Sequence, residues 1–150
     1  MAEVTHAQWL ATVRKYEGTQ YHHQGRLPGI GMDCPAPLIC GAWETGLKPR
    51  SFDVTGYPSN PNGMLRGLCD EHLEPIALSE AVAGDVLLTA WAREKMAPRH
   101  LGILTDATPG RMYWLQAENA RYHMVRIVRL MFGTDGMHLV QAYRVPGVVS

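Results

Sequence analysis

A cysteine that directly follows an aspartate, Cys34 after Asp33, is the best candidate for chemistry in this sequence. The pair lies in GIGMDCPAPLIC (29–40), between a glycine-rich approach and two prolines. Prolines are tolerated in the first turn of a helix, so the segment predicts a helix that begins at about Cys34. The positive end of a helix lowers the pKa of a thiol, and the backbone N–H of Cys34 is placed to stabilise an oxyanion. We therefore expect Cys34 to be a nucleophile.

A thiolate nucleophile needs a proton carrier, and His100 is the best placed of the seven histidines. The β-rich runs 100–105 and 111–116 flank DATPG, a sequence typical of a turn. They predict a hairpin in which Thr105 pairs with Arg111.

In this register His100 lies opposite Gln116. Side chains directly across an antiparallel pair are close enough to interact. The Gln116 amide is then able to accept a hydrogen bond from one imidazole nitrogen and leave the other facing the sulfur. A shift by two residues would instead place Glu118 opposite His100, so Glu118 and Asn119 remain alternatives for the third group.

Cys40 and Cys69 are expected to pack in the core, because both fall within predicted helices. A zinc site built from the three cysteines and His72 is disfavoured, because structural zinc sites usually show paired short spacings. We expect no metal and no cofactor.

Composition restricts the class of protein. The 150 residues are 46% hydrophobic and 19% charged, which is typical of one globular domain spanning 1–150. Fourteen basic and fourteen acidic side chains cancel, so nucleic-acid binding is not expected. No apolar run is long enough for membrane insertion and the first residues do not resemble a secretory signal. Three cysteines without a framework pattern predict synthesis in a reducing bacterial cytoplasm.

Helical patterns fill the first half of the chain and strand patterns the second half. A capping-box pair, Thr5 and Gln8, begins a helix that ends at Gly18; further helices are predicted from about Cys34 to Gly46 and from Met64 to Leu73. Five β-rich runs follow: 85–92, 100–106, 111–117, 123–130 and 138–145. Helices followed by antiparallel strands predict an α+β fold, with the N-terminal helices packed on a five-stranded antiparallel sheet.

Four segments together resemble the NlpC/P60 family of cysteine peptidases, and most closely its small cell-wall peptidases encoded among phage tail genes. The segments are GMDCPAPLI, AGDVLLTAW, PRHLGILTD and WLQAENARYHMVRIVRL, in that order. The resemblance implies a papain-like core with Cys34 as nucleophile and His100 as base. The third position falls on Gln116, where the family most often has histidine; a neutral amide orients the imidazole without adding charge.

The resemblance also implies two substrate-binding residues. Asp33 is similar to the acidic neighbour of the family's nucleophile, which is able to meet a substrate ammonium. Tyr21 corresponds to a tyrosine that family members often carry in the preceding loop.

The expected function is cleavage of peptidoglycan stem peptides, between γ-D-glutamate and a diamino acid. A chain without a signal peptide needs another route to this substrate. Incorporation in a phage tail or gene-transfer particle would bring it to the periplasm or cell wall. Its partners would then be tail-tip or baseplate proteins, docked through the loop 48–63. An inactive structural component of the tail tip, and a thiol acyltransferase or amidase, are the alternatives.

Overall fold

The computed structural model describes residues 2–59, 63–91, 98–119, 121–133 and 137–150. The described helices are α1 (His6–Arg14), α2 (Ala36–Thr45) and α3 (Met64–His72), with a short 3-10 helix at Leu78–Glu80. The strands of the main sheet are β4 (Glu74–Ile76), β5 (Val86–Trp91), β6 (Pro98–Asp106), β7 (Tyr113–Glu118), β8 (Met124–Arg129) and β9 (Met137–Arg144). Two small pairings complete the elements: β1 (Val4–Thr5) with β10 (Val148–Val149), and β2 (Arg26–Leu27) with β3 (Gly31–Met32).

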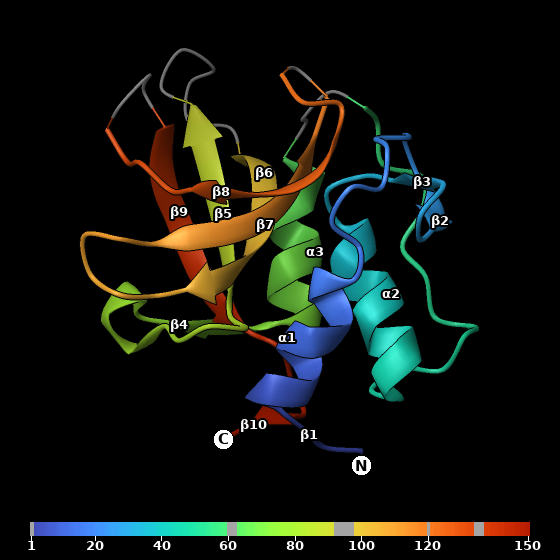
Figure 1. Cartoon of the computed structure of the whole chain (residues 1–150), viewed down its shortest axis with the longest axis horizontal. Helices are drawn as coiled ribbons and strands as arrows, with labels where there is room; N and C mark the ends of the chain where they lie inside the picture. The colour runs from blue at the N-terminus through green and yellow to red at the C-terminus, as the bar shows by residue number, and fades with distance from the viewer. Residues whose placement is uncertain (1, 60–62, 92–97, 120, 134–136) are drawn as a thin grey trace.

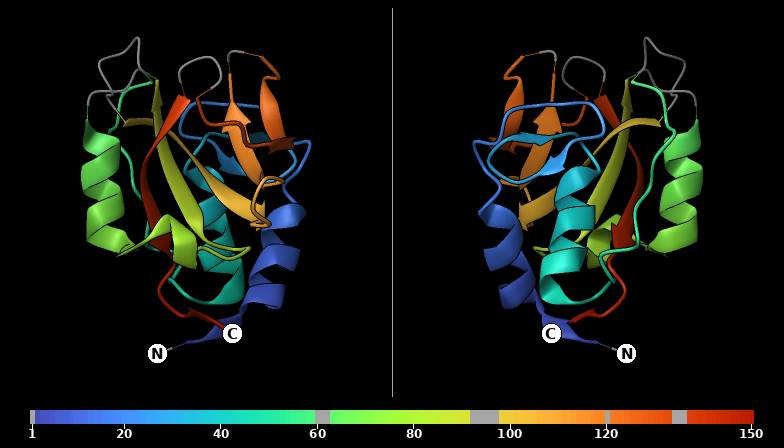
Figure 2. Two further views of the ribbon diagram at one scale, coloured as in Figure 1. Left: turned by 90° about the vertical axis from the view of Figure 1, so that its left-hand side faces the viewer. Right: turned by 90° about the vertical axis from the view of Figure 1, so that its right-hand side faces the viewer.

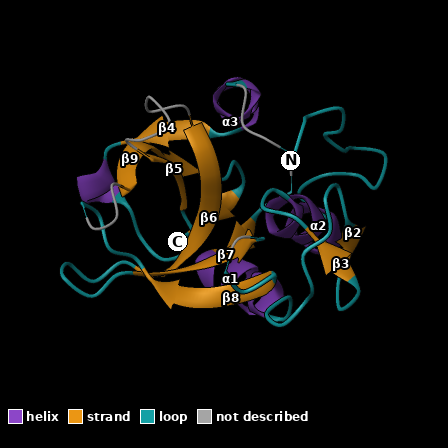
Figure 3. Cartoon of the chain, turned by 90° about the horizontal axis from the view of Figure 1, so that it is seen from above, coloured by secondary structure: helices purple, strands orange, loops and turns teal. Residues whose placement is uncertain are grey.

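Six described strands form one antiparallel sheet in the order β4-β9-β5-β6-β7-β8. All five predicted runs are strands in this sheet. The sixth, β4, was not predicted, because it has three residues and contains Pro75. A proline inside a strand is usually found at a sheet edge, since it donates no ladder hydrogen bond, and β4 is an edge strand. Seen from above, the strands follow a strongly curved arc (Figure 3).

The helices follow the predicted order, with shifted ends. The capping box is present as predicted: the Thr5 side chain accepts from the Gln8 N–H, and the Gln8 side chain accepts from the Thr5 N–H. α1 ends at Arg14, and the chain continues as turns to Gly18, whose φ is +92°. α1 and α2 lie side by side (Figure 1), and α3 stands apart from α1 in side view (Figure 2). Cys69 of α3 nevertheless belongs to the same core cluster as Trp9 of α1 and Ala36 of α2. None of the described helices has the length and apolar character needed to cross a membrane.

Both faces of the sheet are covered by apolar side chains, which explains why the central strand β5 is almost wholly buried. On the helix side, Trp9 and Val13 of α1 pack with Leu88 and Leu115. On the other side, Leu104 and Trp114 belong to a second cluster.

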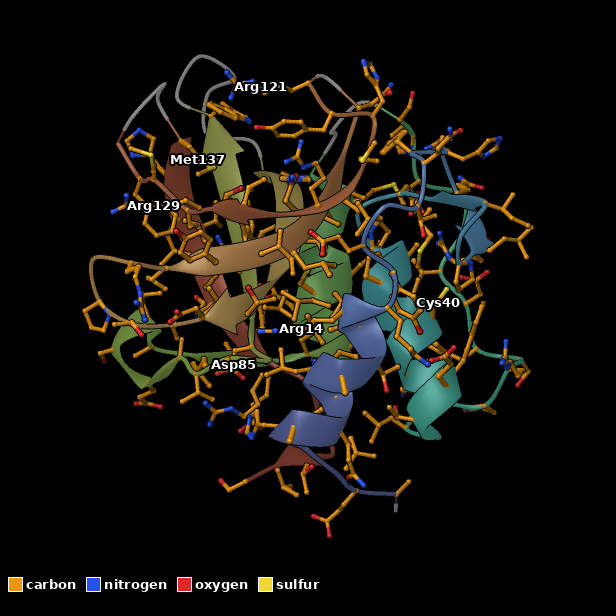
Figure 4. The ribbon with its side chains drawn as sticks, viewed as in Figure 1. Arg14, Cys40, Asp85, Arg121, Arg129 and Met137 are labelled. Carbon is orange, nitrogen blue, oxygen red and sulfur yellow. The ribbon has the colours of Figure 1, made fainter. Side chains whose placement is uncertain are left out.

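A buried ion pair holds the beginning of β5. The Asp85 carboxylate is 1% exposed and accepts hydrogen bonds from the Arg144 guanidinium at 3.1 and 2.9 Å. It also accepts from the Val82 N–H, as expected for a residue that shapes the turn before a strand. Figure 4 shows Asp85 at the end of the sheet nearest α1.

Candidate active site

Cys34 lies in the short connection between β3 and α2 and is half-buried. The helix begins later than predicted: Pro35 is the N-cap, with φ −80° and ψ −14°, and Ala36 is the first helical residue. The Cys34 sulfur therefore precedes the helix instead of belonging to its first turn. The backbone N–H of Leu101 on β6 lies near enough to the sulfur to lower the pKa of the thiol.

The environment of the Cys34 thiol corrects the expectation of a lowered pKa. Burial raises the pKa of the thiol to about 12, and the adjacent Asp33 carboxylate also raises it. The Leu101 N–H and the Arg26 guanidinium act in the opposite direction but do not compensate. Desolvation outweighs the favourable field of a helix that starts two residues later. The resting group is therefore a thiol, and a base has to remove its proton during attack.

His100 is on β6, the strand that contacts the sulfur, and is half-buried. It pairs with Thr89 of β5, and the register shifts directly after this pair because of a β-bulge. Bulges of this kind re-aim a side chain next to them. The His100 ring also meets the edge of the Trp114 ring, with a centroid distance of 5.3 Å and an interplanar angle of 83°. Strand pairing and ring contact together fix the imidazole.

Gln116 of β7 contacts His100 directly: its Oε1 lies 2.5 Å from His100 Nε2. The Gln116 side chain is only 4% exposed. In the tautomer that donates from Nε2 to the amide oxygen, the other ring nitrogen, Nδ1, is unprotonated and able to act as a base. The structure therefore brings together the predicted base and its predicted orienting group.

The register predicted for this hairpin is wrong, although the contact is present. Leu104 pairs with Trp114, whereas the predicted register would pair it with Met112. The turn is longer than DATPG, and a bulge between Leu104 and Asp106 changes the register. Gln116 reaches His100 diagonally rather than from the directly opposite position.

Asn119 and Glu118 were the alternatives to Gln116 as the third catalytic group. Asn119 Oδ1 lies 3.0 Å from His123 Nδ1, so its amide is engaged with a different histidine. The Glu118 side chain lies outside the part of the chain that the structure describes.

The described ladder between β6 and β7 is short. It pairs Ile103 with Leu115, Leu104 with Trp114 and Asp106 with Tyr113. Nearer the start of β6, Leu101 is not among the described pairs with β7, and its N–H acts on the Cys34 thiol instead. The loop that carries Cys34 thus meets the sheet where these two strands have stopped pairing.

Asp33 was expected to meet a substrate ammonium, but the structure buries its side chain inside the protein. Its carboxylate is 1% exposed. It accepts hydrogen bonds from Arg26 Nη1 at 2.9 Å, from the Gln24 N–H at 2.7 Å and from the Tyr57 hydroxyl. Both carboxylate oxygens are engaged within the protein, and this burial argues against direct contact with substrate.

Tyr21 lies beside the nucleophile, as the predicted lining role requires. Burial, together with the charges of Cys34 and Asp33, raises the pKa of its hydroxyl to about 12. Its backbone is bridged to Met32 of β3 and its N–H is donated to the His123 carbonyl at 2.8 Å. A role in substrate binding stays a prediction.

Cys40 and Cys69 are buried core residues, as predicted, and are 2% and 4% exposed. Burial raises the pKa of Cys40 to about 11 and that of Cys69 to about 12. Figure 4 shows Cys40 on α2.

Sequence reasoning missed two features near Cys34. One is Arg26, whose partners come from segments distant in the sequence. The other is an apolar cavity of about 110 Å³ between α2, α3 and the segment 47–57. Pro35 and Leu101, two neighbours of the nucleophile, line it. Phe52 and Tyr57 also line it, so part of the predicted docking loop packs beside the site.

Comparison with known proteins shows a likeness of fold. No protein-family model matches the sequence, and no curated protein matches it. A solved structure from Staphylococcus aureus, described as similar to lipoprotein and of the NLP/P60 family, matches with a TM-score of 0.60 and 19% sequence identity. The match covers 93% of this chain and 41% of that one, so this chain spans less than half of the length of its structural neighbour. The mixed helix and antiparallel-sheet fold is therefore shared with an NlpC/P60-family protein.

Proposed function

We propose that the protein is a cysteine peptidase that cleaves peptidoglycan stem peptides, at the bond between γ-D-glutamate and a diamino acid. One observation carries the proposal. His100 is held by Gln116 from the next strand, and the backbone N–H of its sequence neighbour Leu101 acts on the Cys34 thiol. A thiol, an imidazole and an orienting amide arranged in this way support nucleophilic acyl transfer. The shared NlpC/P60 fold supports a cell-wall substrate.

In the proposed mechanism, His100 Nδ1 takes the Cys34 proton as the sulfur attacks the amide carbonyl. Gln116 accepts from Nε2–H and stabilises the imidazolium that forms. The backbone N–H of Cys34 donates to the oxyanion. His100 then protonates the departing amine, which leaves a thioester on Cys34. A water molecule, deprotonated by His100, attacks the thioester and releases the acid and the thiol.

We also propose that the protein reaches the wall as part of a phage tail or gene-transfer particle, in contact with tail-tip or baseplate proteins. The resemblance of four sequence segments to the small cell-wall peptidases encoded among phage tail genes motivates this route. Antibody labelling of purified particles tests it: the protein should co-purify with tails, and its absence from every particle fraction would contradict the proposal.

A second candidate is a tail component that has kept the fold without the activity. The raised pKa of Cys34 and the uncharged Gln116 favour it. The deciding assay is hydrolysis of N-acetyl-L-Ala-γ-D-Glu-diaminopimelate, with products identified by mass. Cys34→Ala should abolish turnover, whereas Cys40→Ala, the matched control at a buried core cysteine, should retain it. Equal product from wild type and Cys34→Ala would discard the enzyme and favour the structural candidate.

A further inference from the structure

Arg26, near the candidate nucleophile, has a hydrogen-bond acceptor for every N–H of its guanidinium. Its side chain is 10% exposed, and each of its nitrogens contacts an acceptor. Nε donates to Asp53 at 3.0 Å, and Nη1 donates to Asp33 at 2.9 Å and to the Gly25 carbonyl at 3.0 Å. Nη2 donates to the Val54 carbonyl at 2.9 Å and to the Tyr57 hydroxyl at 2.8 Å. Five contacts match the five N–H donors of a guanidinium.

This arrangement gives the Asp33 carboxylate an internal cation. A buried carboxylate without a partner is strongly unfavourable, and the Arg26 guanidinium supplies the compensating charge at 2.9 Å. A substrate ammonium would have to displace it from Asp33. It would also bring a second cation against a guanidinium that is held by four other acceptors.

We propose that Arg26 determines substrate specificity, because its guanidinium occupies the place beside Asp33 that a free ammonium of a substrate would need. The site accordingly cleaves peptides in which the amino group on the acyl side of the scissile bond is already part of an amide and carries no charge. This inference rests on the proposed peptidase function and narrows its substrate class.

Arg26 has a second, positioning role in the same network. It joins the loop before the nucleophile to the segment 53–57, which it holds through Asp53, Val54 and Tyr57. Gln24 Nε2 adds a hydrogen bond to the Tyr57 carbonyl at 3.0 Å. Because Asp33 precedes Cys34 directly, the same contacts fix the approach of the chain to the sulfur.

The compensation of the Asp33 charge by Arg26 is measurable without substrate, because both charges act on the ionisation of the Cys34 thiol. The titratable and charged groups that act on the Cys34 thiol are Asp33, Arg26 and Cys69, and the Tyr21 hydroxyl is coupled to it. Removing Arg26 leaves the Asp33 carboxylate uncompensated in the alkaline range, where the thiol ionises. The thiolate is then harder to form, since a nearby anion raises the pKa of a thiol.

The first experiment is the rate of iodoacetamide labelling of Cys34 at pH 8, followed by mass spectrometry. Arg26→Gln should label about three- to tenfold more slowly than wild type, because each unit of pKa changes the thiolate fraction about tenfold. Asp33→Asn should label faster, and the double variant should return to within about twofold of wild type. Arg66→Gln is the matched control, since Arg66 is 48% exposed and pairs only loosely with Asp70 at 3.8 Å.

Thermal unfolding of each variant shows whether it is folded. A purely structural role for Arg26 predicts lower stability without this pattern of compensation. If folded Arg26→Gln labels like wild type, or if the double variant labels like Arg26→Gln, the internal-cation inference is overturned.

The second experiment compares L-Ala-γ-D-Glu-diaminopimelate with its N-acetylated form. Wild type should favour the acetylated peptide in kcat/KM, and Arg26→Gln should shift the ratio toward the free amine by about tenfold or more. Wild-type preference for the free amine would overturn the specificity inference and leave the peptidase intact. If wild type cleaves neither peptide, this result counts against the proposed function and removes the specificity inference that rests on it. The labelling experiment still decides whether Arg26 acts as an internal cation for Asp33.

Discussion

The contact between His100 and Gln116 allows a quantitative prediction for the variant Gln116→Ala. When His100 takes the thiol proton it becomes an imidazolium, and its Nε2–H then makes a charge-assisted hydrogen bond to the Gln116 oxygen, 2.5 Å away in the resting structure. A hydrogen bond to a charged group contributes about 1.5–3 kcal/mol. Losing it should lower kcat by about 10- to 150-fold.

The matched control is Gln141→Ala. Gln141 is a partly buried glutamine of β9 whose amide donates to the Ile76 and Ala142 carbonyls. This variant also loses buried amide hydrogen bonds, but none to the imidazole. Steady-state hydrolysis of the N-acetylated stem tripeptide by both variants, with circular dichroism to confirm folding, tests the reasoning. If Gln116→Ala is folded and keeps wild-type kcat, or if Gln141→Ala loses as much, Gln116 does not orient the base.

Three further predictions concern the thiols and the sheet. Iodoacetamide labelling of Cys34 should rise about tenfold per pH unit between pH 7 and 10, because burial raises its pKa to about 12; a plateau below pH 8 would contradict this. The free energy of unfolding should fall above about pH 9, by up to about 1.4 kcal/mol per pH unit for each of Cys40 and Cys69. The sign follows from their raised pKa values, since the fold keeps both thiols neutral while the unfolded chain ionises; urea titrations should show a shallower fall in Cys69→Ala. Gly102→Ala should lower both stability and turnover, since a Cβ there would lie 2.5 Å from the Trp114 ring that packs on His100; unchanged melting and unchanged hydrolysis would refute the clash.

Much of the fold follows from local patterns. The capping box at Thr5 and Gln8 acts over three residues, and the strand runs are long and rich in β-branched or aromatic residues, so both are visible in the sequence. The start of α2 was missed by two residues because prolines at 35 and 37 are compatible with several positions of the first turn. β4 is too short, and too exposed at the sheet edge, to leave a pattern.

The candidate site was predictable in its residue types but not in its electrostatics. Cys34, His100 and Gln116 stand out as a thiol before a helix and a pair of polar residues in a hairpin. The environment of Asp33 depends on Arg26 and Tyr57, which no sequence periodicity connects. The pKa of Cys34 likewise depends on burial by distant segments, which a local argument from the helix end does not contain.

The site is built where the regular sheet is interrupted. A continued ladder between β6 and β7 would use the backbone groups of Leu101 and bring the two strands together. Because the described ladder stops at Ile103, the Leu101 N–H is available to the Cys34 sulfur. The same interruption allows Gln116 to reach His100 diagonally, and the missing side chain at Gly102 leaves room for Trp114 against the imidazole. A substitution that restored regular pairing here should therefore stabilise the sheet and impair the site together, as expected where stability and function compete for the same backbone groups.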